Sequence, residues 1–395
     1  MHITHIFPMF KEVHGGAEPV IFNLLKYLTN QGIRNALVTP YIPEDMRQYI
    51  DPRVEIISGS TAAGGSRNIL LQGFINLLTT SFLSKKIPNR TDAVCFHTET
   101  VIPALFTYML RGRKRPAVYF CYQPPRFAYD TGAETAQAGG LLGKLIHPFS
   151  AVYRPFDKFA VRKVDQVFTF SSDYKAWIES IYSIDGVRVI PPGVKKPDKI
   201  DDLPEETKSS ITESGPIILF VGKLVPWKNI DRLINITGLL KKRFPGIRLL
   251  IVGDGPSMPF LGDHVRSTGL SENVIFAGYV GSKDVFSYYS AADLFVILEK
   301  NISFGLCLVE ANSCGLPVVA FRAGGPVDII DDGKNGFLLP NNATDEFIAS
   351  TIAVILKDSE GLAESKKHSI SRSSKFTWEN FAKMFAEGVS PIIGD

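Results

Sequence analysis

The chain has 395 residues, of which 45% are hydrophobic and 21% are charged, so it is long enough for two domains with sizeable cores and too apolar for a disordered protein. The formal net charge of +3 combines +8 in residues 1–200, with 24 basic and 16 acidic residues, and −5 in residues 201–395, with 19 and 24. This asymmetry predicts an anionic partner for the first half, either a membrane surface or a phosphorylated acceptor, and the lack of a basic-aromatic motif argues against nucleic acid.

Short apolar runs alternate with helical patterns along the first half of the chain. The predicted strands are residues 2–7, 35–39, 53–57, 92–96, 117–121, 165–170 and 187–190. The predicted helices are residues 16–31, 69–86, 99–111, 150–163 and 173–182. The first strand begins at the N-terminus, so no signal peptide is expected, and residues 69–87 carry too many polar side chains for a membrane-spanning helix.

Residues 195–216 break this alternation with charges and prolines, and we interpret them as the connector between two domains. The strands predicted beyond the connector are residues 217–221, 247–252, 273–277, 293–297, 317–320 and 336–338. The helices predicted there are residues 229–243, 257–268, 282–291, 306–314, 324–331, 343–357 and 377–389. Strands separated by helices indicate parallel βαβ units, so the sequence predicts an α/β fold with two doubly wound, Rossmann-like domains facing each other across a cleft.

Two loops directly after predicted strands contain residues suited to an anion. Gly15 and Gly16 open the first helix, and paired glycines let a backbone approach an anion closely, although an ordinary flexible turn has the same composition. Gly222 is followed by Lys223 and Lys228, two ammonium groups that suit a diphosphate. The alternative for the second loop is solvated surface lysines.

A third loop ends at Gly305, where a helix begins whose free N–H groups can hold a phosphate. Glu310 lies about one turn further along, where a carboxylate can bind a ribose diol; the alternative is a core helix with one surface acid. Residues 253–256 are interpreted as a tight strand-to-helix turn. Residues 119–126 and 276–280 form two aromatic-rich loops. Each loop either covers a sugar or a base of the substrate, or its aromatic side chains only pack against the rest of the protein.

The sequence lacks the motifs that are typical of several classes of enzyme and metal site. The four cysteines have no CxxC pair and no histidine at zinc spacing, so we expect buried free thiols in a reducing compartment; they are Cys95, Cys121, Cys307 and Cys314. The sequence contains no Asp-x-Asp, HExxH, GxSxG or GxxxxGK[ST] pattern, which argues against zinc hydrolases, serine acyl transfer and phosphate-loop NTPases. We expect no metal.

Together the motifs resemble those of the retaining glycosyltransferases of family 4, which have the GT-B architecture. The resemblance covers nearly the whole chain and is strongest over residues 216–340. The matching segments are 15–18, 190–194, 220–229, 251–256, 304–319, 324–325 and 332–337.

The resemblance implies acceptor binding by residues 1–195, donor binding by residues 196–376 and a terminal helix, residues 377–395, that crosses back to the first domain. It implies retaining, metal-independent transfer of a hexose from GDP-mannose or a UDP-hexose to a glycan or lipid-linked acceptor, in polysaccharide or glycoconjugate biosynthesis and without a cofactor. Lys223 and Lys228 would face the diphosphate and Glu310 the ribose, and these are the catalytic candidates. The donor-binding candidates are Gly15, Gly16, Gly222, Tyr279, Val280, Ser303, Phe304, Gly305, Leu306 and Glu310.

Two positions depart from the family pattern. Ile302 stands where the family has the first glutamate of its motif, and it cannot accept a hydrogen bond from a sugar hydroxyl. Losing one charged partner costs about 1.5–3 kcal/mol of binding unless Glu299 or Ser303 compensates. The loop that commonly reads Cys-His-x-Pro-Pro-Arg reads Cys-Tyr-Gln-Pro-Pro-Arg here. The acceptor-side candidates in that loop are Tyr122, Gln123 and Arg126.

These departures leave an alternative function open: a nucleotide-sugar-binding homologue without catalysis that acts as a partner subunit. An epimerase or phosphorylase of the same architecture is a third class. Residues 111–115 and 141–154 mix positive charge with apolar side chains. They predict association with an anionic lipid surface, or else solvated charges beside core helices. With no signal peptide or spanning helix expected, the sequence predicts a cytoplasmic protein, with a peripheral position at the inner face of the membrane as one alternative.

Overall fold

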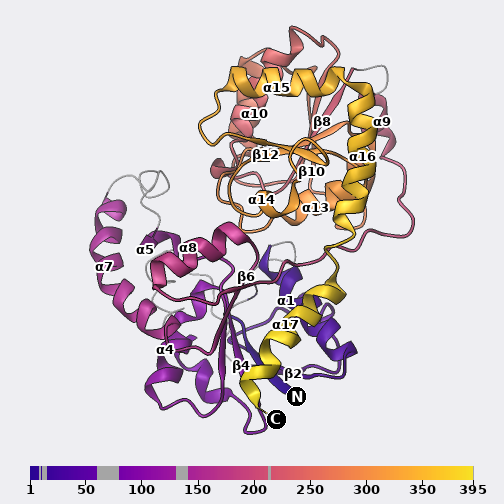
Figure 1. The fold of residues 1–395 in the computed structure, drawn as a ribbon. Coiled ribbons are helices and arrows are strands. Elements are labelled where there is room, and N and C mark those ends of the chain that lie inside the picture. The colour runs from indigo at the N-terminus through magenta and orange to yellow at the C-terminus, as the bar shows by residue number, and fades with distance from the viewer. Residues whose placement is uncertain (9, 11–15, 60–79, 130–140, 212–214, 395) are drawn as a thin grey trace. The chain divides into compact units, whose positions relative to one another are not determined.

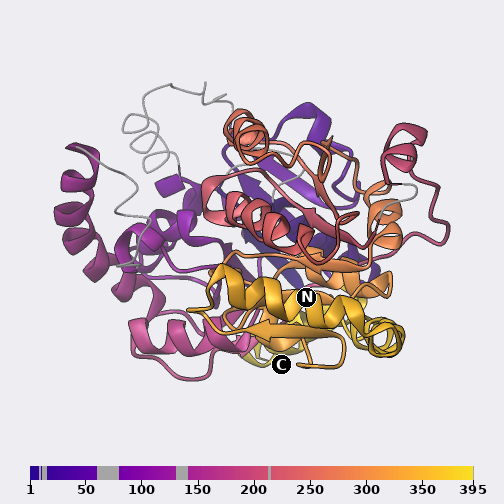
Figure 2. The same ribbon diagram turned by 90° about the horizontal axis from the view of Figure 1, so that it is seen from above.

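The computed structural model describes residues 1–8, 10, 16–59, 80–129, 141–211 and 215–394, without the side chains of residues 141–149. The chain divides into two compact units, one made of Met1–Pro192 with Trp378–Asp395 and the other of Gly193–Thr377 (Figure 1). Helices flank the sheet in each unit (Figures 1 and 2). We describe each unit by itself.

The described part of the first unit contains a parallel seven-stranded sheet in the order β3-β2-β1-β4-β5-β6-β7. Its strands are β1 (His2–Ile6), β2 (Arg34–Thr39), β3 (Glu55–Ser58), β4 (Ala93–His97), β5 (Ala117–Phe120), β6 (Gln166–Thr169) and β7 (Arg188–Val189). Every residue of β1 and β4 is buried, as expected for central strands covered on both faces. The predicted strands and the doubly wound fold class are confirmed.

The helices of the first unit follow the prediction where it falls on described residues. They are α1 (Ala17–Asn30), α2 (Glu44–Arg47), η1 (Leu83–Lys86), η2 (Glu99–Val101), α4 (Ile102–Leu110), α5 (Arg126–Tyr129), α7 (Leu141–Val161), α8 (Ser172–Tyr182) and α17 (Trp378–Ile393). Most of the predicted helix at 69–86 lies outside the described residues. The sequence did not predict α2 and α5, each of which is only one turn long.

Helix α17 belongs to the first unit although the second unit separates the two in sequence. Its residues Phe381 and Phe385 are fully buried, and the Phe385 ring stacks on His5 of β1 with 5.8 Å between centroids. Figure 1 shows α17 beside the strands of this unit. The apolar face predicted for residues 377–389 is therefore core.

The described part of the second unit has a parallel six-stranded sheet in the order β10-β9-β8-β11-β12-β13. Its strands are β8 (Ile217–Val221), β9 (Arg248–Val252), β10 (Val274–Gly278), β11 (Leu294–Val296), β12 (Val318–Phe321) and β13 (Gly336–Leu339). Its helices are α9 (Glu205–Ile211), η3 (Pro226–Lys228), α10 (Ile230–Lys241), α11 (Met258–Ser267), α12 (Val285–Ala291), α13 (Leu306–Ser313), α14 (Pro326–Ile329), α15 (Asp345–Lys357) and α16 (Ser359–Ser373).

Two helices of the second unit were missed from the sequence. Helix α9 lies in the polar segment that we interpreted as a connector. Helix α16 buries the small polar residues Ser365, Ser369 and Ser373 at helical spacing instead of large apolar ones. The Ser369 hydroxyl donates to the Asn335 carbonyl at 3.3 Å. A helix packed through serines carries no apolar periodicity, which is why the sequence pattern did not reveal it.

Candidate functional site

In each sheet the strand order reverses at one place, between β1 and β4 in the first unit and between β8 and β11 in the second. Ligands of doubly wound sheets bind outside the carboxyl ends of the strands at such a switch point. In the second unit the loop after β8 contains Lys223 and Lys228, and the loop after β11 leads to Gly305. The fold therefore brings the two predicted anion-binding loops to the same edge.

Glycines let the loops after β8 and β9 touch backbone to backbone. A Cβ added to Gly253 would lie 1.9 Å from the Gly222 carbonyl oxygen, and one added to Gly255 would lie 2.4 Å from that of Leu224. Gly253 also has a φ of 136°, which disfavours any other residue. Residues 253–256 therefore lie in a tight turn between β9 and α11, as predicted, and they also support the loop that carries the lysines.

Lys228 forms an ion pair across the switch point. Its Nζ lies 2.6 Å from Oε2 of Glu299, and the two side chains are only 18% and 11% exposed. Next to it, Asn229 adopts a left-handed conformation with a φ of 53°, and its side-chain amide donates to the Leu298 carbonyl at 2.6 Å. These contacts fix the position of the Lys228 ammonium, whereas Lys223 is exposed in the same loop.

The start of α13 is held by a second pair of glycines. Gly305 precedes the helix with a φ of 100°. A Cβ added to Gly325 would lie 1.9 Å from the Phe304 carbonyl oxygen, and the Gly325 N–H donates to the Ile302 carbonyl at 2.8 Å. The start of α13 at Leu306 is thus held at a fixed place, as an anion site requires, although the Leu308 N–H already donates to the Gly305 carbonyl at 3.0 Å.

Glu310 is partly buried on α13 and accepts a hydrogen bond from the Tyr289 hydroxyl at 2.9 Å. Burial raises the pKa of Glu310, and the bond from Tyr289 partly opposes this. Burial also raises the pKa of Cys307 to about 12, while Lys228 lowers it and Glu310 and Glu299 raise it further. The Cys307 thiol in the first turn of α13 is thus influenced by the Lys228 ammonium and by the carboxylates of Glu310 and Glu299.

Ile302 is buried in the segment between β11 and α13, where the family has a glutamate. Its carbonyl bonds to Gly325, but its side chain offers no polar atom. Glu299, which could have supplied a carboxylate in its place, is engaged by Lys228. Ser303 is partly buried beside it.

Tyr279 and Val280 follow β10, two strands from β8 at the same edge of the sheet. Tyr279 is 54% exposed. The preceding Gly278 has a φ of 69°, and its carbonyl accepts a hydrogen bond from the Gly253 N–H at 2.7 Å. The predicted base-binding residues are therefore tied to the same set of loops as the lysines.

The acceptor-side candidates lie at the carboxyl end of β5 in the first unit. The Tyr122 hydroxyl is 3.2 Å from Nδ1 of His97, and the Gln123 amide donates to Oε1 of Glu99 at 3.4 Å. Arg126 is partly buried at the start of α5. Gly16 is exposed directly before α1 with no heavy atom within 4 Å of an added Cβ, and Gly15 lies outside the described residues.

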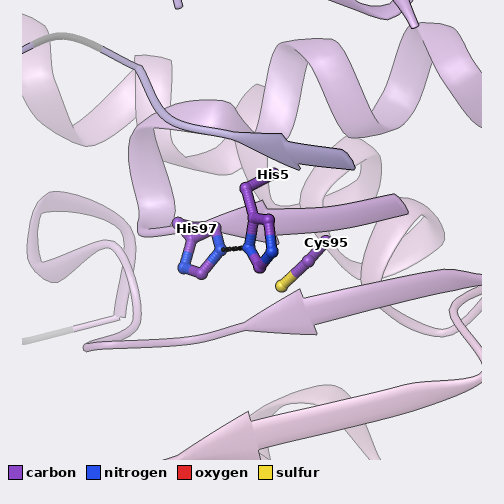
Figure 3. A group of neighbouring side chains, drawn as sticks. All are labelled: His5, Cys95 and His97. Atoms are coloured by element: carbon purple, nitrogen blue, oxygen red, sulfur yellow. Dashed lines mark hydrogen bonds between the residues drawn. The ribbon is translucent and has the colours of Figure 1, made fainter. Parts of the chain in front are cut away.

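A buried group that the sequence did not predict lies beside Tyr122. His5 of β1 and Cys95 and His97 of β4 have ligand-type atoms within 4.8 Å of one another (Figure 3). Spacing along the chain gave no sign of it, because the residues meet only when two parallel strands pair. The one available signal was a pair of histidines inside runs otherwise typical of buried strands.

Burial keeps this group uncharged. It lowers the pKa of His5 to about 4 and that of His97 well below its usual value, and it raises the pKa of the Cys95 thiol. His5 Nδ1 and His97 Nε2 lie 2.9 Å apart and share a hydrogen bond. Cys95 and Cys121 are buried free thiols as predicted, whereas Cys307 and Cys314 are only partly buried.

Family models match both halves of the chain. The model described as Glycosyltransferase Family 4 matches residues 14–196, and the one described as Glycosyl transferases group 1 matches residues 202–375. The boundary between the two matches falls close to the division between the two units.

Among curated proteins, the chain is 28% identical over 252 residues to a D-inositol 3-phosphate glycosyltransferase of Nocardia farcinica, covering 60% of this chain and 55% of that protein. It is 31% identical over 150 residues to a GDP-mannose-dependent alpha-(1-6)-phosphatidylinositol monomannoside mannosyltransferase of Mycolicibacterium smegmatis, covering 36% and 39%. The alignments thus span about half the length of these relatives or less.

Solved structures share the fold over the whole chain. Sucrose-phosphate synthase from Thermosynechococcus elongatus superposes with a TM-score of 0.79 at 20% identity, covering 99% of this chain and 98% of that one. HepE of Anabaena in complex with UDP-glucose gives a TM-score of 0.70 at 19% identity, covering 99% and 100%. At these identities the likeness establishes the fold alone.

Proposed function

The chain belongs to glycosyltransferase family 4 and has the GT-B fold, and on this premise we propose that it transfers a hexose from a nucleotide diphosphate sugar to a glycan or lipid-linked acceptor. We propose retention of configuration, no metal ion and no cofactor. One observation carries the proposal: Lys228 lies at the switch point of the second sheet, held by Glu299 beside the start of α13.

The proposed role of the second unit is to bind the donor and stabilise its leaving group. Negative charge grows on the diphosphate as the bond to the sugar opens, and an ammonium and helix N–H groups already in place lower the energy of that state. An ammonium has three donors, so Lys228 can keep its bond to Glu299 and still bind a phosphate oxygen. Lys223 adds a second charge from the exposed part of the same loop.

Glu310 is proposed to accept hydrogen bonds from the ribose hydroxyls. The Tyr289 hydroxyl donates a hydrogen bond to Oε2 of Glu310 at 2.9 Å. This bond orients the carboxylate and leaves it able to accept further hydrogen bonds from a diol. Tyr279 and Val280 are proposed to lie against the base, and Gly15 and Gly16 to approach the donor from the first unit. The acceptor hydroxyl is placed close to the sugar by residues of the first unit, so that little covalent help is needed.

Two donors are proposed, GDP-mannose and a UDP-hexose. A mycobacterial relative is described as GDP-mannose-dependent, and the structural neighbour HepE was solved with UDP-glucose. A transfer assay with radiolabelled GDP-mannose and UDP-glucose, with and without EDTA, tests the proposal. Activity that EDTA abolishes contradicts the metal-independent mechanism.

A nucleotide-sugar-binding protein without catalysis is the second candidate, and Ile302 is the observation that favours it. This buried side chain replaces a carboxylate that would hold the donor sugar. Thermal shift with the same nucleotide sugars separates the two functions, because a ligand that binds only the folded state raises Tm whether or not it reacts. Stabilisation without turnover on any acceptor favours the second function.

We also propose that the first unit binds the inner, cytoplasmic face of an anionic membrane. The end of α7 and the turn after it combine the exposed rings of Phe156 and Phe159 with Lys158, Arg162 and Lys163, and some of these residues line a shallow hollow. Basic and aromatic side chains that lie together favour an anionic lipid surface. No helix within the described ranges is long and apolar enough to cross a bilayer.

A further inference from the structure

Four side chains of the first unit form a continuous row of hydrogen bonds that ends at Tyr122. Asn35 Oδ1 is 3.2 Å from His5 Nε2, His5 Nδ1 is 2.9 Å from His97 Nε2, and His97 Nδ1 is 3.2 Å from the Tyr122 hydroxyl. The two histidines are fully buried, Asn35 is 3% exposed and Tyr122 is 6% exposed. Every ring nitrogen of both histidines is therefore engaged within the row (Figure 3 shows the central pair).

The Asn35 end of the row has a defined orientation. Its Nδ2 donates to the Ile33 carbonyl at 2.9 Å and to the Thr29 hydroxyl at 3.0 Å. A carbonyl oxygen can only accept, so the nitrogen of the Asn35 amide must face Ile33 and the oxygen must face His5. His5 Nε2 therefore carries a hydrogen.

The orientation of the Asn35 amide determines the direction of the other hydrogen bonds in the row. An uncharged imidazole has a hydrogen on only one of its two nitrogens, so His5 Nδ1 has none and accepts a hydrogen bond from His97 Nε2. His97 is uncharged for the same reason of burial, so its Nδ1 also lacks a hydrogen. The partner of that Nδ1 is the Tyr122 hydroxyl, which must donate.

We propose that Tyr122 binds a sugar hydroxyl of the substrate as a hydrogen-bond acceptor only, because its own phenol proton is committed to His97. Tyr122 follows β5 at the carboxyl end of the sheet, next to the β1–β4 switch point. The rings of Phe170 and Phe120, with centroids at 4.7 and 5.1 Å, hold it in place. The substrate hydroxyl donates its hydrogen to the phenol oxygen, and no covalent bond changes.

The inference deepens the proposed function and rests on it for the identity of the hydroxyl. An imidazole, which the family commonly has at this position, can donate or accept according to its tautomer. The Tyr122 oxygen with a committed proton rejects groups that only accept, such as ether and carbonyl oxygens. Tyr122 is thus assigned a role in substrate specificity. His97 and His5 are positioning residues, because they determine where the Tyr122 proton points.

The first experiment measures the tautomers by ¹⁵N NMR of the histidine-labelled full chain, with signals assigned from His5→Gln and His97→Gln variants. The expected result is two uncharged imidazoles with hydrogen on Nε2, and a shift of His97 Nδ1 in Tyr122→Phe. A hydrogen on His97 Nδ1, or one equivalent of bound zinc that His97→Gln loses, overturns the proposal. This result is obtained whether or not the protein transfers sugar.

The second experiment compares kcat/KM with UDP-glucose and GDP-mannose. Tyr122→Phe keeps the ring but removes the acceptor, and we expect a loss of about tenfold, which Tyr122→His partly restores. The matched control is Tyr108→Phe, which removes another buried hydroxyl, bonded to the Arg115 carbonyl at 2.9 Å, and leaves kcat/KM unchanged. Full activity of Tyr122→Phe overturns the inference, whereas an inactive wild type with the expected tautomers contradicts only the proposed function.

Discussion

The Lys228 ammonium lies 2.6 Å from a Glu299 carboxylate oxygen across the reversal in strand order of the second sheet. The two residues come from loops 71 positions apart in sequence. The cation that we assign to the donor diphosphate is thus positioned before any ligand arrives, and no conformational search is needed to place it. A positioned charge contributes more to transition-state stabilisation than a mobile one.

Lys228→Ala should lower kcat by about 100- to 1,000-fold, the usual effect of removing one donor that stabilises developing charge. It should also destabilise the fold by about 1–3 kcal/mol, because Glu299 keeps its partly buried carboxylate without a partner. Kinetics and urea unfolding measure the two effects. The control is the double variant Lys228→Ala/Glu299→Ala, which should be more stable than the single variant but equally inactive. Near-normal transfer by the single variant Lys228→Ala would contradict the role assigned to Lys228.

Glu310→Gln should separate stability from binding. Because burial raises the folded-state pKa of Glu310, its contribution to stability is fully present below the ordinary pKa of 4.5 and is lost as pH rises through the raised value. The glutamine variant should therefore be more stable than wild type at pH 7, with the advantage shrinking toward pH 4. Unfolding free energies from pH 4 to 8 check this.

The same variant should bind UDP about tenfold more weakly, because a neutral amide replaces the charged acceptor for the ribose diol. Calorimetry with UDP and GDP measures the change. Unchanged affinity would remove Glu310 from the proposed donor site while leaving the pH dependence of stability intact.

Gly325→Ala should destabilise the second unit by about 1–3 kcal/mol, because the added Cβ would lie 1.9 Å from the Phe304 carbonyl oxygen and would push the loop before α13 away. Gly16→Ala is the matched control, since its φ is −72° and no heavy atom lies within 4 Å of the added Cβ. Chemical unfolding of both variants tests the difference. A loss of donor affinity in the stable Gly16 variant would support a close backbone approach there.

Membrane binding should depend on the charges at the end of α7 and in the turn after it. Lys158→Gln and Lys163→Gln should each weaken binding to phosphatidylserine vesicles at low salt by about fivefold. Lys26→Gln, on α1 of the same unit, serves as a control and should have little effect. Flotation measures the bound fraction, and wild-type protein that does not float with these vesicles would rule out the lipid surface.

The sequence predicted the fold because parallel strands such as β1 and β4 are buried on both faces and appear as short, continuous apolar runs. It placed Lys228 and Gly305 in loops that follow strands, where ligands of such sheets bind, and their role as ligand contacts stays a prediction. The Lys228–Glu299 pair could not be predicted, since it depends on which loops meet across the sheet. The His5–His97 contact arises in the same way from strand pairing, and α16 was hidden because serines replace its apolar face.

The placement of α17 has a consequence for synthesis of the chain. Gly388 packs so closely on Phe168 that a Cβ there would lie 2.5 Å from its ring, and Phe385 covers His5. A ribosome releases α17 only after it has made all of the second unit. The first unit therefore remains an incomplete nascent domain, in which His5 lacks its contact with Phe385, while the second unit already has all the residues it needs to fold.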